Sequence, residues 1–326
     1  MNILEVKDLN MSYKTIDGNV DAVKDVSFTV KQGESFGLVG ESGCGKTSVA
    51  MSLLQLQADN GKITSGEIIF DGQNIVNLSE AELREVRWSG ISIVFQGAMN
   101  SWNPVVKIGE QIREAMREHY PNKTKDENTK KILELFEIVG LDGSIIDRYP
   151  HELSGGQRQR VGIARALSME PKLIICDEPV SALDVSVQAQ IINLLEDLQR
   201  ELGIAYLFIA HDLAVVKHIS HKVIVMYLGK IMEFGEGDDL YSNPRHPYTK
   251  ALMDAAPIPD PKIERNRKKI VLKGELPSPL NPPSGCVFSS RCNFVSDACK
   301  VETPILQDCG AEHKAACIRL DELENA

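Results

Sequence analysis

Long apolar runs are absent from the sequence: none approaches the ~18–20 residues that a helix needs to cross a bilayer. The N-terminal residues MNILEVKDLNMSY also lack the basic start and the apolar core of a secretion signal. Together these absences predict a chain that stays in the cytoplasm. Internal repeats and low-complexity tracts are missing as well, so each motif described below occurs once.

Positive charge is scarce relative to negative charge. The 326 residues include 36 Lys and Arg against 46 Asp and Glu, which gives a formal net charge of -10 and a pI of about 5.3. Nucleic-acid-binding proteins usually present a basic face, so this balance argues against a nucleic-acid partner. The length allows one large domain with an appendage, or two modest domains.

Short apolar runs rich in Val, Ile and Phe alternate with longer segments of helical periodicity, which is typical of an α/β fold. Past residue 238 the pattern changes, and proline-rich residues 257–283 predict an extended connection to a small cysteine-containing tail. The expected strands are 35–39, 91–95, 173–176, 205–210 and 222–227. The expected helices are 46–56, 130–139, 157–168 and 186–202.

The segment GESGCGKT, residues 40–47, matches the phosphate-binding P-loop and lies between an expected strand and an expected helix. Its glycines let successive N–H groups face the phosphates, and the helix N-terminus adds partial positive charge. Lys46 is placed to reach the β- and γ-phosphates and Thr47 to bind Mg²⁺, while nearby N–H groups are expected to lower the pKa of the Cys44 thiol. The predicted ATP-binding residues here are Gly40, Ser42, Gly43, Cys44, Gly45, Lys46, Thr47 and Ser48.

A second motif, LIICDE at residues 173–178, ends an apolar strand with two acidic residues. Ligands of α/β proteins bind at the carboxyl ends of such strands. Asp177 is expected to hold Mg²⁺, directly or through water, and Glu178 to polarise the attacking water. Adjacent acidic residues after a strand are common in loops, so this motif indicates a nucleotide site only together with the P-loop.

A third motif, LSGGQ at residues 153–157, ends a loop and begins a helix. The Ser154 side chain and the N–H groups of Gly155 and Gly156 form a second anion-binding helix start, although a plain N-cap would also suffice for an isolated Ser-Gly-Gly. In their order along the chain, with LSGGQ between the P-loop and the acidic motif, the three motifs resemble those of the ABC ATPases. In that family this signature sequence, here Ser154, Gly155, Gly156 and Gln157, binds the γ-phosphate of a nucleotide held by the opposite subunit.

The resemblance covers most of residues 1–240 and implies further roles. It implies that Gln96 senses Mg²⁺ and relays to membrane subunits, and that His211 contacts the γ-phosphate. It also implies that Tyr13 lies against adenine and that Asp184, at the end of the SALD segment, crosses a dimer interface. The implied catalytic residues are Glu178, His211 and Gln96, and the implied Mg²⁺ ligands are Thr47, Gln96 and Asp177.

The expected architecture is a P-loop ABC ATPase cassette with a RecA-like core, an antiparallel β subdomain and a helical subdomain. The cassette is expected at residues 1–240, with the helical subdomain at about 97–160, and a small cysteine-containing extension at 241–326. Because the chain has one P-loop and one signature sequence, a site built from both needs two cassettes face to face. We therefore expect a dimer with a second copy or a related ATPase subunit.

Three segments, QGAMNSWNP at 96–104, DVSVQAQ at 184–190 and HPYTKAL at 246–252, resemble ATPase subunits of dipeptide and oligopeptide importers. This resemblance spans essentially the whole chain. It implies a peripheral ATPase on the cytoplasmic face of the membrane, two transmembrane permeases, usually a second non-identical ATPase, and an extracytoplasmic peptide-binding protein. The subfamily also serves nickel, glutathione and some sugars, so the solute stays open.

Five of the seven cysteines crowd the C-terminal tail, which in a cytoplasmic chain indicates metal ligation before disulfides. Cys286, Cys292, Cys299 and Cys317 match cysteines of the importer group, in which some members carry a [4Fe–4S] cluster. Four thiolates can bind such a cluster or zinc, and a typical zinc ribbon is disfavoured because no C-x2-C pair is present. Ordinary reduced thiols are the third alternative, and Cys309 has no matching role.

Two functions of other classes remain alternatives. A soluble ABC ATPase of DNA repair would carry long coiled-coil insertions, and one of translation would carry two cassettes; the sequence has neither. A metal-sensing regulator would make the tail the functional part, which the presence of Lys46, Asp177, Glu178 and His211 disfavours.

Overall fold

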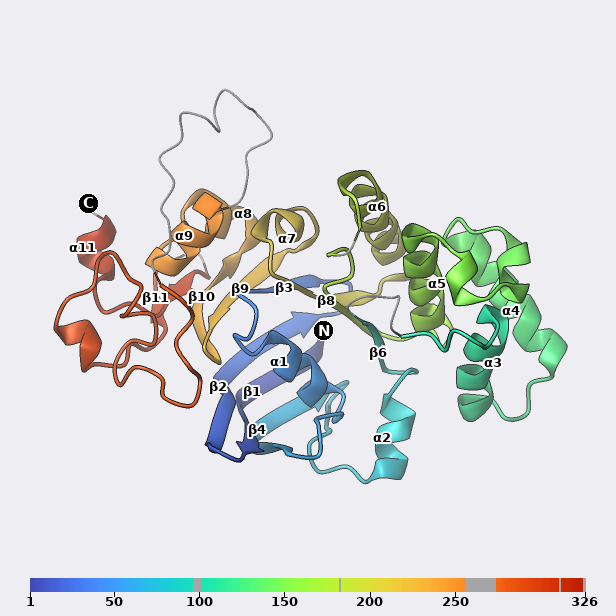
Figure 1. Ribbon diagram of the computed structural model, residues 1–326, viewed down its shortest axis with the longest axis horizontal. Helices are drawn as coiled ribbons and strands as arrows, with labels where there is room; N and C mark the ends of the chain where they lie inside the picture. The colour runs from blue at the N-terminus through green and yellow to red at the C-terminus, as the bar shows by residue number, and fades with distance from the viewer. Residues whose placement is uncertain (96–100, 182, 256–273, 311, 325–326) are drawn as a thin grey trace. The chain divides into compact units, whose positions relative to one another are not determined.

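Residues 1–95, 101–181, 183–255, 274–310 and 312–324 are described by the computed structural model (Figure 1). The chain divides into two units, each described here by itself. The first unit comprises Met1–Ile3, Val30–Glu34 and Asp71–Ile209. The second comprises Leu4–Thr29, Ser35–Phe70 and Ala210–Ala326, and so contains both the P-loop and the described part of the cysteine tail.

An antiparallel sheet in the second unit has the strand order β2-β1-β4. Strand β1 (Asn2–Thr15) pairs with β4 (Gly61–Phe70), for example Val6 with Ile68, and both of these residues are buried. In β2 (Gly18–Lys31), buried residues such as Val26 and Phe28 alternate with exposed ones. This period of two is what a sheet with one buried face requires.

A second sheet of this unit has the order β11-β12-β10-β9-β3. Strand β3 (Ser35–Val39) is buried on both faces and runs parallel to β9 (Lys222–Tyr227), which pairs antiparallel with β10 (Lys230–Glu236). The tail adds β12 (Lys314–Ala315), paired with β10, and β11 (Gln307–Asp308). A segment of the cysteine tail is thus hydrogen-bonded into the sheet that carries the P-loop strand.

Helices cover this sheet (Figure 1). The covering helices are α7 (Leu213–Ile219), α8 (Gly237–Ser242) and α9 (Pro247–Ala255), while α1 (Lys46–Leu53) follows the P-loop. Gly37 in β3 explains the close approach of α7, because a Cβ there would lie 2.3 Å from Cγ1 of Val216. Helix α1 ends before the predicted residue 56, since Gln55 has a left-handed φ of 51°. The tail also includes the short helix α11 (Leu320–Glu324).

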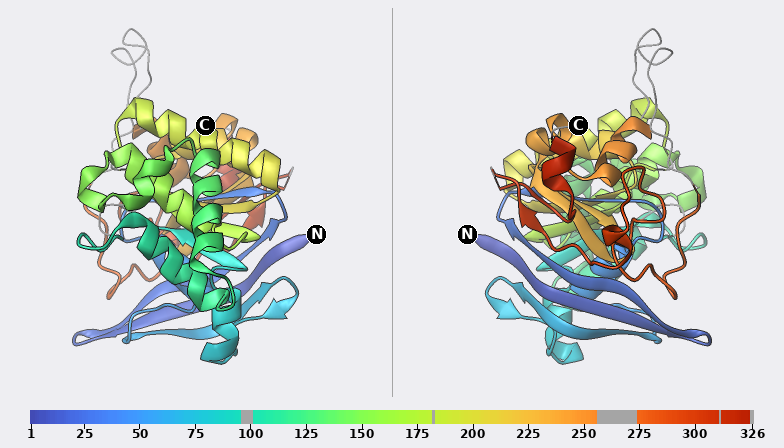
Figure 2. Two further views of the ribbon diagram at one scale, coloured as in Figure 1. Left: turned by 90° about the vertical axis from the view of Figure 1, so that its right-hand side faces the viewer. Right: turned by 90° about the vertical axis from the view of Figure 1, so that its left-hand side faces the viewer.

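The first unit contains the parallel strands β6 (Ile91–Val94), β7 (Leu173–Asp177) and β8 (Ala205–Ala210), in the order β8-β7-β6. Its short β5 (Gln73–Asn74) precedes helix α2 (Glu80–Val86). The other helices are α3 (Ile108–His119), α4 (Lys125–Ile138), α5 (Gly155–Leu167) and α6 (Val185–Leu202). Helices α3, α4 and α5 pack in sequence against one another (Figure 2).

The predicted α/β class, with an antiparallel sheet and helical elements, is confirmed. Each strand and helix expected from the sequence is present with small changes at the ends. The helix expected at 130–139 begins earlier, at Lys125, because Thr124 and Glu127 form a reciprocal capping box. Among the described residues, no helix combines the length and the apolar character of a membrane span.

Candidate functional site

The P-loop connects the buried strand β3 to helix α1 in the second unit. Two of its glycines have left-handed backbone angles, with φ of 81° at Gly43 and 107° at Gly45. A Cβ on Gly45 would lie 2.3 Å from the carbonyl oxygen of Ala22, so a larger residue would displace backbone. Helix α1 has no side-chain cap at its N-terminus, so no capping side chain competes with an anion for its first N–H groups.

The buried Lys46 side chain folds back over this loop. Its Nζ atom donates hydrogen bonds to the carbonyl oxygens of Gly40 at 2.7 Å and Glu41 at 3.0 Å. Cys44 is fully buried, and burial raises the pKa of its thiol although the charge of Lys46 partly opposes the rise. The expected lowering of this pKa is therefore wrong, because desolvation outweighs the neighbouring N–H groups and the lysine.

Tyr13 lies beside the first turn of α1. Tyr13 belongs to strand β1, which precedes the P-loop in sequence, and its hydroxyl is 3.3 Å from Oγ of Ser48 in α1. Thr47 and Ser42 are exposed at the loop, and His211 is exposed after β8. The structure therefore brings Tyr13 to the P-loop within the second unit, while its contact with adenine stays a prediction.

The acidic motif lies in the first unit, at the carboxyl end of the fully buried strand β7. Asp177 is only 4% exposed. Glu178 follows with a left-handed φ of 46°, and its N–H donates to the carbonyl oxygen of Ile209 at 2.9 Å. A non-glycine residue in this conformation costs about 1–3 kcal/mol and tends to occur at functional sites. The end of β7 and this turn therefore set the backbone positions from which the Asp177 and Glu178 side chains extend.

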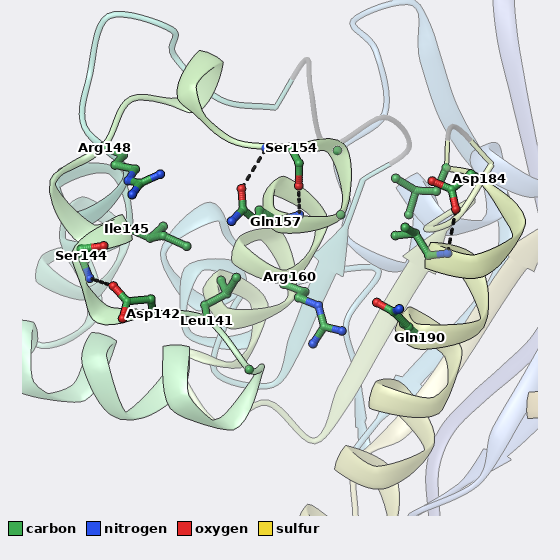
Figure 3. A pocket seen from close by; sticks show the side chains of 15 residues that line it. Leu141, Asp142, Ser144, Ile145, Arg148, Ser154, Gln157, Arg160, Asp184 and Gln190 are labelled. Carbon is green, nitrogen blue, oxygen red and sulfur yellow. Dashed lines mark hydrogen bonds between the residues drawn. The ribbon is translucent and has the colours of Figure 1, made fainter.

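The signature sequence starts helix α5 in the same unit. The Ser154 Oγ accepts a hydrogen bond from the N–H of Gln157 at 3.2 Å, and Oε1 of Gln157 accepts one from the N–H of Ser154 at 3.0 Å. This capping box borders a pocket of about 740 Å³ (Figure 3). Arg148 and Arg160 also line the pocket, so two cationic side chains accompany the helix N-terminus. Such a combination suits an anion.

Asp184 lines this pocket as the N-cap of helix α6. Its Oδ1 accepts hydrogen bonds from Oγ of Ser186 at 2.7 Å and from the N–H of Val187 at 3.0 Å. These bonds, led by that of Ser186, lower the pKa of the Asp184 carboxyl. Because the carboxylate is engaged in capping, the role of Asp184 across a dimer interface stays a prediction. Gln96, residues 97–100 and residue 182 lie outside the described residues, as does the predicted connection up to residue 273.

Two family models match the chain. One, described as ABC transporter, matches residues 23–181, and the other, described as oligopeptide/dipeptide transporter, C-terminal region, matches residues 232–299. The oligopeptide transport ATP-binding protein OppF of Salmonella typhimurium is 48% identical, covering 98% of this chain and 97% of that protein. The chain belongs to the oligopeptide transport ATP-binding proteins of the ABC transporter family. It is thus an ABC-type ATPase, as the resemblance of its motifs implied.

Other members of the family and several solved structures agree. The oligopeptide transport ATP-binding protein AppF of Bacillus subtilis is 48% identical, covering 97% of this chain and 96% of that protein. The dimeric ATP-binding cassette MJ0796, bound to ADP and Pi, is 29% identical with a TM-score of 0.65, covering 72% of this chain and 98% of that one. For cbiO1 of Clostridium perfringens the identity is 30% and the TM-score 0.65, covering 74% and 91%.

The predicted iron–sulfur cluster at Cys286, Cys292, Cys299 and Cys317 is wrong. The four residues do line one cavity, but its volume is only about 20 Å³. Within the described ranges, no group of three or more His, Cys, Asp or Glu side chains has a geometry that could hold a metal ion, zinc included. The relatives named above are described as oligopeptide transport ATP-binding proteins.

Burial raises the pKa of the Cys286 thiol to about 11, and burial also raises the pKa values of Cys292 and Cys317. None of the seven cysteines, all of which lie within the described residues, forms a disulfide. The sequence predicted that the four cysteines lie together, and they do line one cavity, but their spacing did not specify the distances among their sulfur atoms.

The sequence reasoning missed the arginines of the signature pocket and every contact between the tail and the P-loop. Arg148 stands shortly before the signature and Arg160 shortly after it, so their proximity in sequence was an available signal. No local pattern could have found the contact of Arg291 with Glu41, because 250 residues separate them. The segment 246–252 was noted for its resemblance alone, without a role for Tyr248.

Proposed function

We propose that this chain hydrolyses ATP to power the import of oligopeptides through transmembrane permeases, to which it binds peripherally at the cytoplasmic face of the membrane. The observation that carries the proposal is its 48% identity, over nearly the full length of both chains, to OppF. The match of residues 232–299 to the C-terminal region of oligopeptide/dipeptide transporters supports peptides over nickel or glutathione as the solute. An extracytoplasmic peptide-binding protein delivers the solute to the permeases.

The ATPase works as a dimer with an identical or related subunit. Each chain offers one uncapped P-loop helix and one signature pocket, and both are anion sites. A γ-phosphate held between the P-loop of one subunit and the signature of the other is bound by both helix starts. The dimeric state of MJ0796, a relative of similar fold, supports this arrangement.

Within each site the charge of the phosphates is neutralised from several directions. Lys46 exchanges its two loop carbonyls for phosphate oxygens, and the first N–H groups of α1 surround them. The Thr47 hydroxyl and the Asp177 carboxylate, with Gln96, are hard oxygen donors suited to Mg²⁺, which when bound draws charge from the β- and γ-phosphates. Glu178 polarises the attacking water and His211 contacts the γ-phosphate.

Vesicles reconstituted with the chain, a second ATPase subunit, the permeases and the binding protein test this function. ATP-dependent uptake of a labelled oligopeptide is expected. Glu178→Gln should retain ATP binding but slow hydrolysis and uptake by about 10²–10⁴-fold, the usual contribution of a general base. Uptake of nickel or glutathione without peptide would replace the solute, and ATP hydrolysis that no solute stimulates would overturn the transport function.

A further inference from the structure

Glu41, the second residue of the P-loop, is held by the cysteine tail. Nη1 of Arg291 lies 2.9 Å from Oε1 and 2.8 Å from Oε2 of Glu41. The Arg291 side chain is 8% exposed and that of Glu41 26% exposed, so this ion pair is largely removed from water. Both residues belong to the second unit. A shielded ion pair with charge-assisted hydrogen bonds is stronger and better ordered than one on an open surface.

The backbone of Glu41 is held as well. Its N–H donates to the hydroxyl of Tyr248 in α9 at 3.0 Å, and its carbonyl oxygen accepts from Nζ of Lys46 at 3.0 Å. The side chain, the N–H and the C=O of this one residue are therefore all engaged. Two of the three partners come from beyond residue 240, and the third is the lysine that binds phosphate.

An aromatic cluster, defined as Tyr227, Tyr248 and Phe288, keeps these partners in place. The ring centroids of Tyr227 and Tyr248 are 4.8 Å apart, and that of Phe288 lies 5.3 Å and 5.2 Å from them. All three side chains are fully buried. Arg291 follows Phe288 in a turn closed by a hydrogen bond of 3.0 Å from the N–H of Arg291 to the Phe288 carbonyl oxygen. The cluster thus fixes the base of Arg291 relative to Tyr248.

A carboxylate in a phosphate-binding loop is electrostatically unfavourable unless its charge is compensated. ATP brings several negative charges to the N–H groups that follow Glu41, and like charges repel strongly where water is partly excluded. The guanidinium of Arg291 cancels the charge of Glu41. The same contact orients the loop from which Lys46 extends.

We propose that Arg291 and Tyr248 are positioning residues for ATP binding, through which the cysteine tail sets the nucleotide affinity of the P-loop. They act on Glu41 and do not touch the reacting atoms. The tail is therefore part of the nucleotide site in function, although it follows every phosphate-binding motif in sequence.

The test measures ATP affinity of the full-length chain with a fluorescent ATP analogue, together with KM and kcat. In Arg291→Met the dissociation constant and KM should rise about tenfold, because an unpaired, partly buried charge costs on the order of one tenfold step. At saturating ATP, kcat should change by less than about twofold, since weaker uniform binding raises KM alone. Arg291→Lys, which keeps the charge, should retain most of the affinity.

Rescue separates this role from simple support of the tail. Adding Glu41→Gln to Arg291→Met removes the uncompensated charge, so most of the lost ATP affinity should return. Glu41→Gln alone keeps the acceptor for Arg291 and should bind ATP more tightly than the native chain, most clearly at low salt. Lys300→Met is the control, since it removes an equal charge from an exposed tail residue paired with Asp297.

The proposal is overturned if Arg291→Met binds ATP like the native chain, or if the double variant stays as weak as Arg291→Met. An equal loss of affinity in Lys300→Met would likewise overturn it, by showing a nonspecific effect of tail charge. Should Arg291→Met fail to fold, Glu41→Gln alone decides, and weaker ATP binding by that variant would refute the electrostatic role.

Discussion

The P-loop helix α1 and the signature helix α5 are both proposed to bind anions at their N-termini, but these helix starts are built differently. Helix α1 begins at Gly45 without a side-chain cap and carries its own cation in Lys46. Helix α5 begins under a complete capping box, in which Ser154 already occupies the N–H of Gln157. No side-chain cap competes for the first N–H groups of α1, whereas Ser154 would have to serve both as the cap of α5 and as a phosphate ligand.

This difference predicts a division of labour. A helix start with free N–H groups and an adjacent lysine can bind nucleotide by itself. In α5 the serine is occupied by capping, and Arg148 and Arg160 line the pocket. Such a helix start is suited to add contacts to a nucleotide that is already bound elsewhere, rather than to bind it alone. Binding should therefore depend on the P-loop, and hydrolysis on the meeting of the two.

The largest effect is expected from removing the cation of the P-loop. Lys46→Met should weaken ATP binding about a hundredfold, since hydrogen bonds to charged groups contribute about 1.5–3 kcal/mol each and the lysine is proposed to reach two phosphates. Titration calorimetry with Mg-ATP measures the change. Lys62→Met, at an exposed residue of β4, is the matched control. Native ATP affinity in Lys46→Met would refute the hypothesis that nucleotide binding depends on this helix start.

A smaller and different effect is expected from the signature. Ser154→Gly keeps the helix start nearly intact, because glycine at an N-cap costs only a few tenths of a kcal/mol, but it removes the hydroxyl. ATP binding by the single chain should stay native, while hydrolysis at saturating ATP should fall about tenfold, in line with a lost phosphate contact. Steady-state ATPase assays and thermal unfolding check this. A loss of nucleotide affinity equal to that of Lys46→Met would erase the contrast between the two helices.

The sequence predicted local features well because each rests on local backbone chemistry. The strand–glycine–helix order around Lys46 and the buried strand before Asp177 follow from residues adjacent in the chain. The cysteine tail was different, since spacing along the chain constrains neither sulfur distances nor burial. That is why four cysteines gathered at one cavity without forming a metal site.

Long-range contacts were the other limit of the sequence. Nothing near Glu41 indicates Arg291, and nothing near Glu233 indicates His313, 80 residues away. Such pairs form only when strands and tail segments meet in the folded chain. Local periodicity also left out the antiparallel strands β1, β2 and β4, whose burial depends on their order in the sheet.

The smallest effect concerns the attachment of the cysteine tail to strand β10 and helix α8. His313 lies between two carboxylates, with Nε2 at 2.7 Å from Glu233 and Nδ1 at 2.6 Å from Asp239. Burial lowers its pKa, but the hydrogen bonds and charges of the two carboxylates outweigh burial, so the net pKa is raised. His246 behaves oppositely: burial lowers its pKa to about 4, and its Nδ1 accepts from the N–H of Tyr248 at 3.0 Å.

The two histidines stabilise the folded state in different pH ranges, His313 below about pH 6.5 and His246 above it. The contribution of His313 is fully present below the unfolded-state pKa of about 6.5 and is lost as the pH rises through its raised folded-state pKa. The contribution of His246 is present above about 6.5 and is lost as the pH falls toward its depressed pKa. Thermal unfolding from pH 5 to 9 should therefore show a maximum of Tm near pH 6.5. In His313→Gln the decline on the alkaline side should flatten, whereas the exposed control His218→Gln should keep it. An alkaline limb unchanged in His313→Gln would show that the tail is not held to β10 by this charged histidine.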